Sequence, residues 1–248
     1  MKKILVTLIS LFVFIAMIHA ANAKTLRFAT EATYPPFEYT DASGKIKGFD
    51  IDVAKALCKQ MNAQCTFSSQ SFNSLIPSLV LGKYDALIAS LGVTPERLQR
   101  VDFTNAYYEP SASFVDSLDK HYSVNNLEGR IVGVQQGSTF ESYLHDKYGD
   151  KITIKTYASV QDAFSDLTAG RVDVVIADTP IAMEWLKNNS KQYGIIDKPI
   201  VDHQYFGTGF GIAVSKKNPE LLKALNKAIS EIKANGIYNS IYDRYFKS

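Results

Sequence analysis

Residue types that hold metals and cofactors are scarce in this chain, whose 248 residues include four histidines and two cysteines. Three of the histidines, His121, His145 and His203, are far apart in the sequence, which excludes the close ligand spacing typical of a metal site. The glycines of segment 207–211 lack the last glycine and the following helix of a dinucleotide-binding loop. We therefore expect neither a metal nor any other cofactor.

An excess of charge is also lacking. The formal net charge is +2, from 27 basic and 25 acidic residues, and Lys2 and Lys3 account for the difference. Beyond these two lysines the charges balance, which argues against nucleic acid or an anionic membrane surface as the partner. We expect no nucleic-acid partner.

Long apolar runs are absent except near the start, where residues 4–18 are apolar apart from Thr7 and Ser10. The run is shorter than the about 20 apolar residues that span a bilayer, so a membrane anchor is the weaker alternative. Ala21-Asn22-Ala23 then has the small-x-small pattern of a signal-peptidase site. We interpret residues 1–23 as a signal peptide that is cleaved after Ala23. The absence of a cysteine directly after the run argues against a lipid anchor.

The two cysteines, Cys58 and Cys65, are separated by six residues. In an exported protein a close pair favours a disulfide, which would stabilise the fold by about 2–3 kcal/mol through the loop that it closes. Two buried free thiols are the alternative, and the spacing differs from that of a redox Cys-x-x-Cys motif. We interpret the pair as a structural disulfide.

Short β-branched runs alternate with amphipathic stretches along the chain, which predicts α/β architecture with parallel sheets. Asp50 is expected to be the N-cap of a helix from Ile51 to about Met61. A second helix is indicated by Phe72, Leu75, Ile76 and Leu79, spaced i, i+3, i+4, i+7. The strand candidates are residues 26–30, 86–90, 132–134 and 172–177.

One pattern occurs twice, in residues 79–89 and again in residues 167–177. Each copy has a helix end, a glycine at the C-cap, a basic residue, and an aspartate that opens a buried strand. Two such units predict two lobes of similar construction. Because ligands of open α/β sheets bind beyond the carboxyl ends of the strands, Ser90 and Asp178 are expected to meet across a cleft.

Two helix starts support a site for a carboxylate. Thr94 is a capping residue before Pro95, and the segment 138–141 has a capping-box pattern, so each offers free backbone N–H groups. Arg97 in the first of these helices suits bidentate recognition of a carboxylate. A surface ion pair with Glu96 explains its position equally well.

Five motifs together resemble the polar amino-acid-binding proteins of bacterial ABC importers, particularly the arginine-binding and lysine/arginine/ornithine-binding members. The resemblance covers the chain beyond the signal peptide in the order of the family. The motifs are residues 32–38 (ATYPPFE), 48–52 (GFDID), 75–79 (LIPSL), 94–97 (TPER) and 204–209 (QYFGTG).

The resemblance implies a type II periplasmic-binding fold, in which two α/β lobes joined by two crossovers enclose a ligand cleft. By alignment, lobe 1 comprises residues 24–111 and 207–248, and lobe 2 comprises residues 112–206. The resemblance also implies a periplasmic, monomeric protein that delivers its ligand to the membrane permease of an ABC importer. The pair Cys58–Cys65 matches a disulfide of the lysine/arginine/ornithine- and histidine-binding members.

The family's ligand-binding positions carry over to eight residues of this chain. Tyr34 and Phe72 are expected to sandwich the ligand side chain, while Arg97 and Thr139 hold its α-carboxylate. Asp178 and the carbonyl of Ser90 are expected to meet the α-ammonium, and Glu31 the distal cation. Two positions depart from the pattern: Gly92 stands where the family often has a hydroxyl or carboxylate, and Ala89 replaces a serine of the histidine-binding group. The ligand-binding residues are therefore expected to be Glu31, Tyr34, Phe72, Ser90, Gly92, Arg97, Thr139 and Asp178, and the ligand a cationic amino acid: L-arginine first, then lysine, ornithine or histidine.

Other interpretations of these residues stay open at this level. Tyr34 and Phe72 are equally typical of a core, Glu31 of a solvated strand end, and Asp178 of a turn. An enzyme on the same fold, similar to a cyclohexadienyl dehydratase, could use Glu31 or Asp178 for proton transfer. We expect a binding protein without enzymatic activity, because no catalytic constellation is evident.

Overall fold

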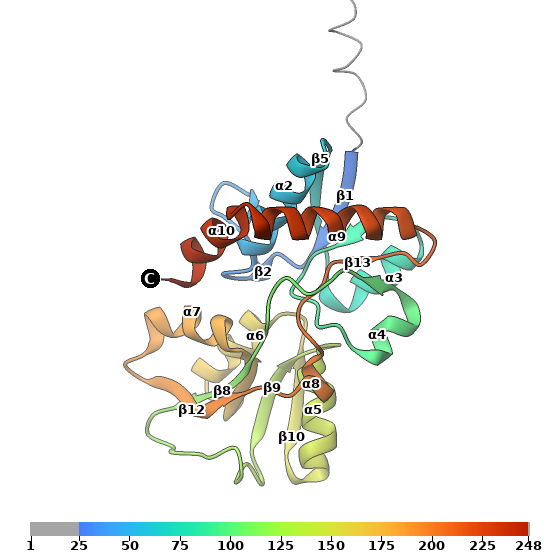
Figure 1. Cartoon of the computed structure of the whole chain (residues 1–248). Helices are drawn as coiled ribbons and strands as arrows, with labels where there is room; N and C mark the ends of the chain where they lie inside the picture. Colours follow the sequence, from blue (N-terminus) through green and yellow to red (C-terminus); the bar gives the residue numbers. More distant parts are fainter. Residues whose placement is uncertain (1–24, 248) are drawn as a thin grey trace, which may run out of the picture.

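Two five-stranded sheets, each covered by helices, form the two lobes of the protein (Figure 1). The computed structural model describes residues 25–247, so the predicted signal peptide lies outside the described residues. The first sheet has the order β5 (Gln64–Ser69), β1 (Thr25–Thr30), β6 (Ala86–Leu87), β13 (Ala213–Val214), β7 (Asp102–Phe103). The second has the order β10 (Thr153–Tyr157), β9 (Ile131–Gln135), β11 (Val174–Asp178), β8 (Ala112–Ser117), β12 (Tyr193–Ile200). The expected α/β class with two lobes is confirmed.

Helices of the first lobe come from both ends of the chain. They are α2 (Phe49–Gln60), α3 (Leu75–Val80), α4 (Pro95–Arg100), α9 (Pro219–Ala234) and α10 (Ile237–Phe246). The second lobe has α5 (Thr139–Tyr148), α6 (Val160–Thr168), α7 (Thr179–Asn189) and the short α8 (His203–Phe206). In Figure 1 the long α9 and α10 lie across the upper lobe, so the chain returns to its first lobe to end. A small sheet of β2 (Thr33–Tyr34), β3 (Glu38–Thr40) and β4 (Ile46–Lys47) completes the upper lobe.

The expectation of purely parallel sheets is wrong. Strand β1 is parallel to β5 and β6, and β9 is parallel to β10 and β11, but β8, β12 and β13 run antiparallel to their neighbours. Strand β8 directly follows a strand of the other sheet, and β13 follows the return crossing. Neither is therefore reached through a βαβ crossover, which is the connection that makes neighbouring strands parallel.

The repeated pattern has the same structural role in both lobes. Asp85 accepts the backbone N–H of Arg27 at the start of β1 at 2.8 Å, and Asp173 accepts that of Ile131 at the start of β9 at 2.8 Å. The glycines before them, Gly82 and Gly170, have φ of 73° and 69°, as expected for helix C-caps. In each lobe the repeat therefore connects the end of a helix, through its aspartate, to the start of a neighbouring strand.

The predicted N-cap role of Asp50 is wrong. Helix α2 begins at Phe49, and no side chain caps it. Its first N–H groups are satisfied by backbone instead, since Phe49 donates to the Pro36 carbonyl at 3.0 Å and Asp50 to that of Phe37 at 2.9 Å. This approach requires Gly48, because a Cβ there would lie 2.1 Å from the Phe37 oxygen. The Asp50 side chain is buried and free to bond elsewhere.

Helix α3 is shorter than the apolar spacing predicts. Phe72 belongs to a separate 3₁₀ turn of residues 72–74, and the α-helix begins at Leu75. A proline such as Pro77 is tolerated only in the first turn of a helix, because it lacks an N–H and its ring clashes with the preceding turn. The helix therefore starts just before Pro77, and Phe72 stays outside it.

The predicted disulfide is present and links Cys58 of α2 to Cys65 of β5, with the Cα atoms 6.0 Å apart. It connects the helix to the edge strand that follows it. The N-caps predicted at Thr94 and Ser138 are also confirmed, since their hydroxyls accept from the N–H groups of Arg97 and Glu141.

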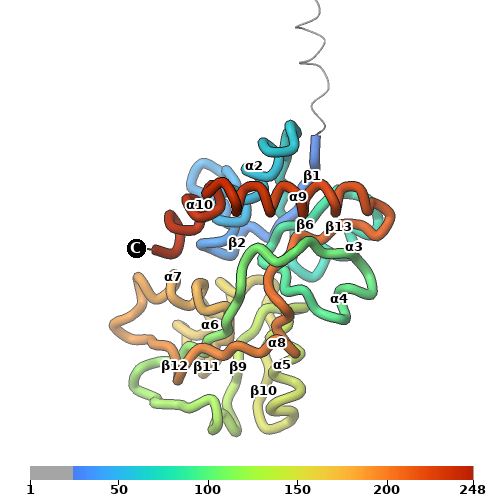
Figure 2. The backbone as a smooth tube through the Cα atoms, viewed as in Figure 1, coloured from blue at the N-terminus to red at the C-terminus, as the bar shows by residue number. Residues whose placement is uncertain are grey.

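Two chain segments run side by side between the lobes (Figure 2). Tyr107 donates its N–H to the carbonyl of Phe210 at 2.8 Å, and Phe210 donates to that of Tyr108 at 2.8 Å. The two connections are therefore bonded to each other as a pair. The lobe boundaries expected near residues 111 and 206 lie close to these segments and stay a prediction.

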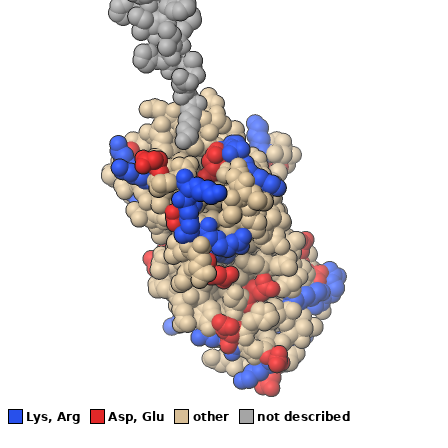
Figure 3. Space-filling model, turned by 90° about the vertical axis from the view of Figure 1, so that its right-hand side faces the viewer, with Lys and Arg blue, Asp and Glu red and all other residues tan. Residues whose placement is uncertain are grey.

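The surface carries both signs of charge. On the face shown in Figure 3, lysine and arginine side chains gather on the upper lobe with acidic side chains beside them. No helix among residues 25–247 is long and apolar enough to span a membrane.

Candidate functional site

A pocket lies between the lobes and receives side chains from both. All eight residues predicted for the site line it. The other residues of the lining are Glu38, Ala89, Pro110, Gln135, Ser138, Phe140, Phe206 and Phe210.

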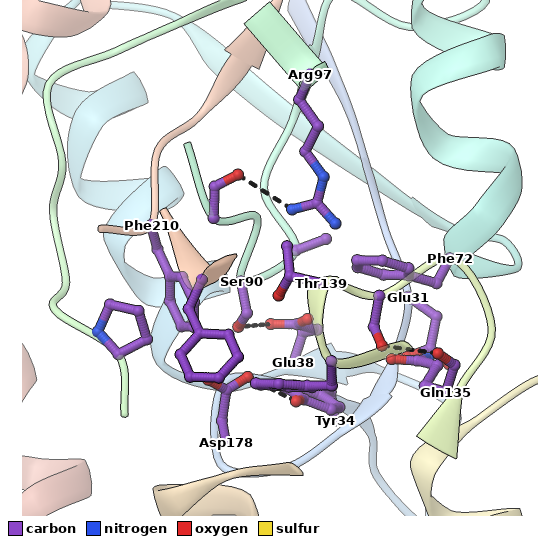
Figure 4. Close-up of a pocket in the computed structure, with 16 residues that line it drawn as sticks. Glu31, Tyr34, Glu38, Phe72, Ser90, Arg97, Gln135, Thr139, Asp178 and Phe210 are labelled. Atoms are coloured by element: carbon purple, nitrogen blue, oxygen red, sulfur yellow. Dashed lines mark hydrogen bonds between the residues drawn. The ribbon is translucent and has the colours of Figure 1, made fainter. Parts of the chain in front are cut away.

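Charged side chains lie on different sides of the pocket. Figure 4 shows Arg97 and Thr139 on one side, Tyr34 with Asp178 on a second, and Glu31 with Gln135 on a third. The first lobe contributes Glu31, Tyr34 and Arg97, and elements of the second sheet contribute Gln135 and Asp178. A ligand here would therefore contact both lobes.

Asp178 is the last residue of β11 and is only 4% exposed. The Tyr34 hydroxyl donates to its Oδ2 at 2.6 Å, across the two lobes. Its Oδ1 is buried without a hydrogen-bond partner among the described residues. Burial raises the pKa of Asp178 to about 7, although the Tyr34 bond and the charge of Arg97 act against this. An unpaired buried carboxylate oxygen is costly, so the pocket provides a place for a hydrogen-bond donor such as an ammonium group.

Asp178 does not act as a turn or cap residue through its side chain. It stands at the N-cap position of α7, but its carboxylate makes no capping bond. The interpretation of Asp178 as a turn-forming side chain is therefore not supported by its contacts.

Arg97 is partly buried in α4 and forms no ion pair with Glu96. Its Nη1 donates to the carbonyl of Gly92 at 3.1 Å, and its Nη2 reaches that of Gly137 in the other lobe at 3.5 Å. Burial lowers the pKa of Arg97 to about 10, which leaves the guanidinium charged at neutral pH. The described residues give it carbonyl oxygens but no carboxylate contact, so it can still bind an anionic group.

Phe72 and Tyr34 differ in their surroundings. The ring centre of Phe72 is 5.6 Å from the Arg97 guanidinium carbon, and Phe72 is partly exposed to the pocket. Tyr34 is buried and stacks on Phe37 with ring centres 6.4 Å apart. Tyr34 therefore belongs both to the core and to the pocket wall, so its interpretation as a core residue is compatible with contact to a ligand.

Glu31 is 5% exposed and is therefore no solvated strand end. The Thr33 hydroxyl donates to its Oε1, and the Gln135 side-chain amide approaches its Oε2 at 3.4 Å. Burial raises the pKa of Glu31, and these two bonds only partly offset that effect. A cation placed here would favour the ionised carboxylate.

Ser90 and Gly92 are placed by unusual backbone contacts. Ser90 has φ of 48°, and its N–H donates to Asp50 Oδ2 at 2.9 Å. Gly92 packs so closely on the returning connection that a Cβ would lie 2.3 Å from the Phe206 carbonyl oxygen. The departure from the family at position 92 thus has a steric reason in this chain.

Sequence reasoning missed Glu38 and Gln135. Glu38 is the last residue of the ATYPPFE motif and is 1% exposed, but Tyr34 is the one residue of that motif predicted to bind the ligand. Gln135 ends β9. The rule that ligands bind beyond the carboxyl ends of strands, applied to the strand predicted at 132–134, points to it directly.

Comparisons with known proteins show which family the chain resembles over its length. Residues 26–248 match the model of a family described as bacterial extracellular solute-binding proteins, family 3. A protein of Escherichia coli (strain K12) that is named as an ABC transporter arginine-binding protein is 48% identical over 248 residues, which is all of both chains. ABC transporter arginine-binding protein 1 of the same strain is 46% identical and covers 99% of this chain and 98% of its own. A solved periplasmic binding protein of Salmonella typhimurium, studied for its high arginine specificity, is 45% identical with a TM-score of 0.86, over 90% of this chain and 100% of its own.

Proposed function

The chain belongs to family 3 of the bacterial extracellular solute-binding proteins, and we propose that it captures free L-arginine and delivers it to an ABC importer. The relatives that share nearly half of its residues are arginine-binding proteins of ABC transporters. The observation that carries the proposal is the buried Asp178, whose Oδ1 has no partner among the described residues, in one pocket with Arg97 and Glu31. A cationic amino acid has a complementary group for each of the three.

The α-groups of the ligand are assigned to residues of both lobes. Arg97 and the hydroxyl and N–H of Thr139 would bind the α-carboxylate, since a guanidinium fork matches a carboxylate. Asp178 would accept from the α-ammonium, with the carbonyl of Ser90 beside it. The ammonium would then satisfy the unpaired Oδ1 and restore the charge that burial disfavours.

The side chain of the ligand is assigned to Glu31, Tyr34 and Phe72. A guanidinium gains about 0.5–2 kcal/mol from an aromatic face beyond the area that it buries. Glu31 is buried, and its hydrogen-bond partners among the described residues are Thr33 and Gln135, so a neutral ligand side chain would leave its carboxylate without a cation. Selectivity for a cationic ligand would come partly from this weaker binding of neutral side chains. Gln135 would hold the Glu31 carboxylate toward the ligand.

The cellular part of the proposal rests on the relatives. Since the close relatives are periplasmic or ABC-transporter binding proteins, we place the protein in the periplasm after cleavage following Ala23. There it would act as a monomer that meets a membrane permease. We propose no enzymatic reaction on the ligand, so incubation with prephenate or arogenate should yield no aromatic product.

Calorimetric titration of arginine, lysine, histidine and glutamine into the wild type and Glu31→Gln tests the proposal. We expect arginine to bind the wild type best, and the substitution to weaken arginine by about 10- to 100-fold, because a charge-assisted bond is lost. Glutamine should lose less, because it brings no charge to position 31. Exposed Glu128→Gln is the matched control and should leave every affinity unchanged. Equal wild-type affinities for glutamine and arginine, or an unaffected arginine affinity in Glu31→Gln, would contradict the assignment.

A further inference from the structure

Two buried carboxyl groups lie beside the pocket without a cationic partner. Glu38 at the start of β3 lines the pocket and is 1% exposed, and Asp50 in the first turn of α2 is fully buried. None of the ion pairs among residues 25–247 includes either of them. Buried carboxylates are normally paired, so this arrangement requires an explanation.

The backbone brings the two carboxyl groups together. The N–H groups of Phe49 and Asp50 bond to the carbonyls of Pro36 and Phe37, directly before Glu38. Gly48 permits this contact with a φ of 127°. As a result both carboxyl groups lie against Ser90: Asp50 accepts its N–H at 2.9 Å, and Glu38 accepts its hydroxyl at 3.4 Å. Two ionised carboxylates are both acceptors, so a hydrogen bond between them needs one proton.

The distribution of donors shows which member keeps the proton. Asp50 Oδ2 accepts from the Ser90 N–H at 2.9 Å and from the Tyr107 hydroxyl at 2.7 Å. Asp50 Oδ1 is buried without a hydrogen-bond partner among the described residues, so a proton on Glu38 could serve it. Glu38 itself receives only the Ser90 hydroxyl, at 3.4 Å. Asp50, which accepts from more donors, is therefore better suited to carry the charge, and Glu38 to carry the proton.

The surroundings favour the same assignment. Burial and the negative charge of Asp50 raise the pKa of Glu38 well above its usual value. Burial raises the pKa of Asp50 to about 6, against the effect of its hydrogen bonds. The other titratable groups that act on the pair are acids and phenols, so none of them offsets a second negative charge. They are Glu31, Tyr34, Tyr107, Tyr108, Asp178 and Tyr238.

The pair holds Ser90 through two groups. The Ser90 N–H bonds to Asp50. The Ser90 hydroxyl bonds to Glu38, as Figure 4 shows. Ser90 also has a positive φ of 48°, which is uncommon for residues other than glycine and needs support from its contacts. The acid pair supplies that support at the wall of the pocket.

We propose that Glu38 is a positioning residue for ligand binding: Glu38 and Asp50 share one proton, and the neutral–ionised pair holds Ser90 in place against the ligand. The part that concerns the ligand rests on the proposed function, because it takes Ser90 to face the α-ammonium. The shared proton itself is a property of the ligand-free protein.

The shared proton is tested by the pH dependence of thermal unfolding without ligand, in the wild type and Glu38→Gln. Folded Glu38 keeps its proton while the unfolded chain releases it above its usual pKa of 4.5. Wild-type stability from this group is therefore fully present below pH 4.5 and is lost as pH rises toward the folded pKa. Glutamine donates the same bond but does not titrate, so the Tm of Glu38→Gln relative to the wild type should rise steadily from about pH 4.5 to 8. A Tm difference that does not change with pH would overturn the shared proton.

The positioning role is tested by arginine affinity at pH 7 in Glu38→Leu and Glu38→Gln. Leucine removes the donor to Asp50 and the acceptor of Ser90, so arginine should bind about 10- to 100-fold more weakly. Glutamine should restore most of the affinity. Wild-type affinity in Glu38→Leu, or equal losses in both variants, would refute the role. If Glu38→Leu does not fold, a large loss of arginine affinity in Glu38→Gln alone would refute the positioning role. Should wild-type protein bind no arginine, the proposed function fails, while the pH dependence of Tm still decides whether the proton is shared.

Discussion

Replacing Asp178 by asparagine tests most directly how this pocket holds an amino acid. The substitution keeps the size of the side chain and an oxygen that can accept a hydrogen bond, but it removes the charge. Asp178 is 4% exposed and its Oδ1 has no partner among the described residues, so the bond to a ligand ammonium would form without competing water. The loss should therefore resemble that of breaking a buried ion pair.

The magnitude follows from that comparison. Removing one partner of a buried ion pair costs about 3–5 kcal/mol, because the other charge stays buried and uncompensated. Since about 1.4 kcal/mol corresponds to a tenfold change in Kd, Asp178→Asn should raise the Kd for arginine by roughly two to three and a half powers of ten. Every amino acid has the α-ammonium, so lysine, histidine and arginine should all weaken together. Glu31→Gln, in contrast, should discriminate between them.

Isothermal titration calorimetry measures these affinities, and Asp116→Asn is a matched control. Asp116 is also a buried aspartate of the second sheet, at 5% exposure, but its carboxylate accepts from the Tyr122 N–H and lies outside the pocket lining. Asparagine can accept the same bond, so arginine affinity should stay at the wild-type value. A Kd for Asp178→Asn within about threefold of the wild type would refute the reasoning, since that is under 0.7 kcal/mol.

Three further changes have defined outcomes. Gly92→Ser adds the hydroxyl that the family often has there, yet it should weaken arginine binding, because a Cβ would lie 2.3 Å from the Phe206 carbonyl oxygen; tighter binding by calorimetry would contradict the steric argument. Replacing Cys58 and Cys65 together by serine should lower the free energy of unfolding by about 2–3 kcal/mol in urea titrations, because the disulfide no longer closes the loop between residues seven positions apart. An equal loss in the free energy of arginine binding would contradict a purely structural role for the disulfide. Saturating arginine should reduce the radius of gyration measured by solution scattering, because ligand contacts on both lobes favour a closed state; an identical profile with and without arginine would rule out closure about the paired connections.

Much of the architecture could be predicted from local patterns. The repeat at 79–89 and 167–177 predicted two similar lobes, and its aspartates do make equivalent bonds to strands β1 and β9. Capping at Thr94 and Ser138 was also predictable, because a cap depends on residues within one turn. The eight candidate site residues all line one pocket, although their binding roles stay a proposal.

Features that depend on distant contacts could not be predicted in this way. The antiparallel strands β8 and β13 depend on where the chain crosses between lobes, which no local pattern encodes. Asp50 has the sequence context of an N-cap, but its first turn is capped by the loop before Glu38, and its carboxylate is left for Ser90 and Tyr107. A helix start alone does not reveal which partner its acidic residue will meet.

Local sequence decided most strands and helices and the caps at Thr94 and Ser138, because those choices depend on side-chain spacing and on bonds within one turn. Only the packing of the two lobes decided the chemistry of the pocket. It placed Tyr34 against Asp178, 144 residues apart, and Gln135 against Glu31, 104 residues apart. Tertiary packing also buried four carboxyl groups, Glu31, Glu38, Asp50 and Asp178, and this burial is the main cause that raises their pKa values.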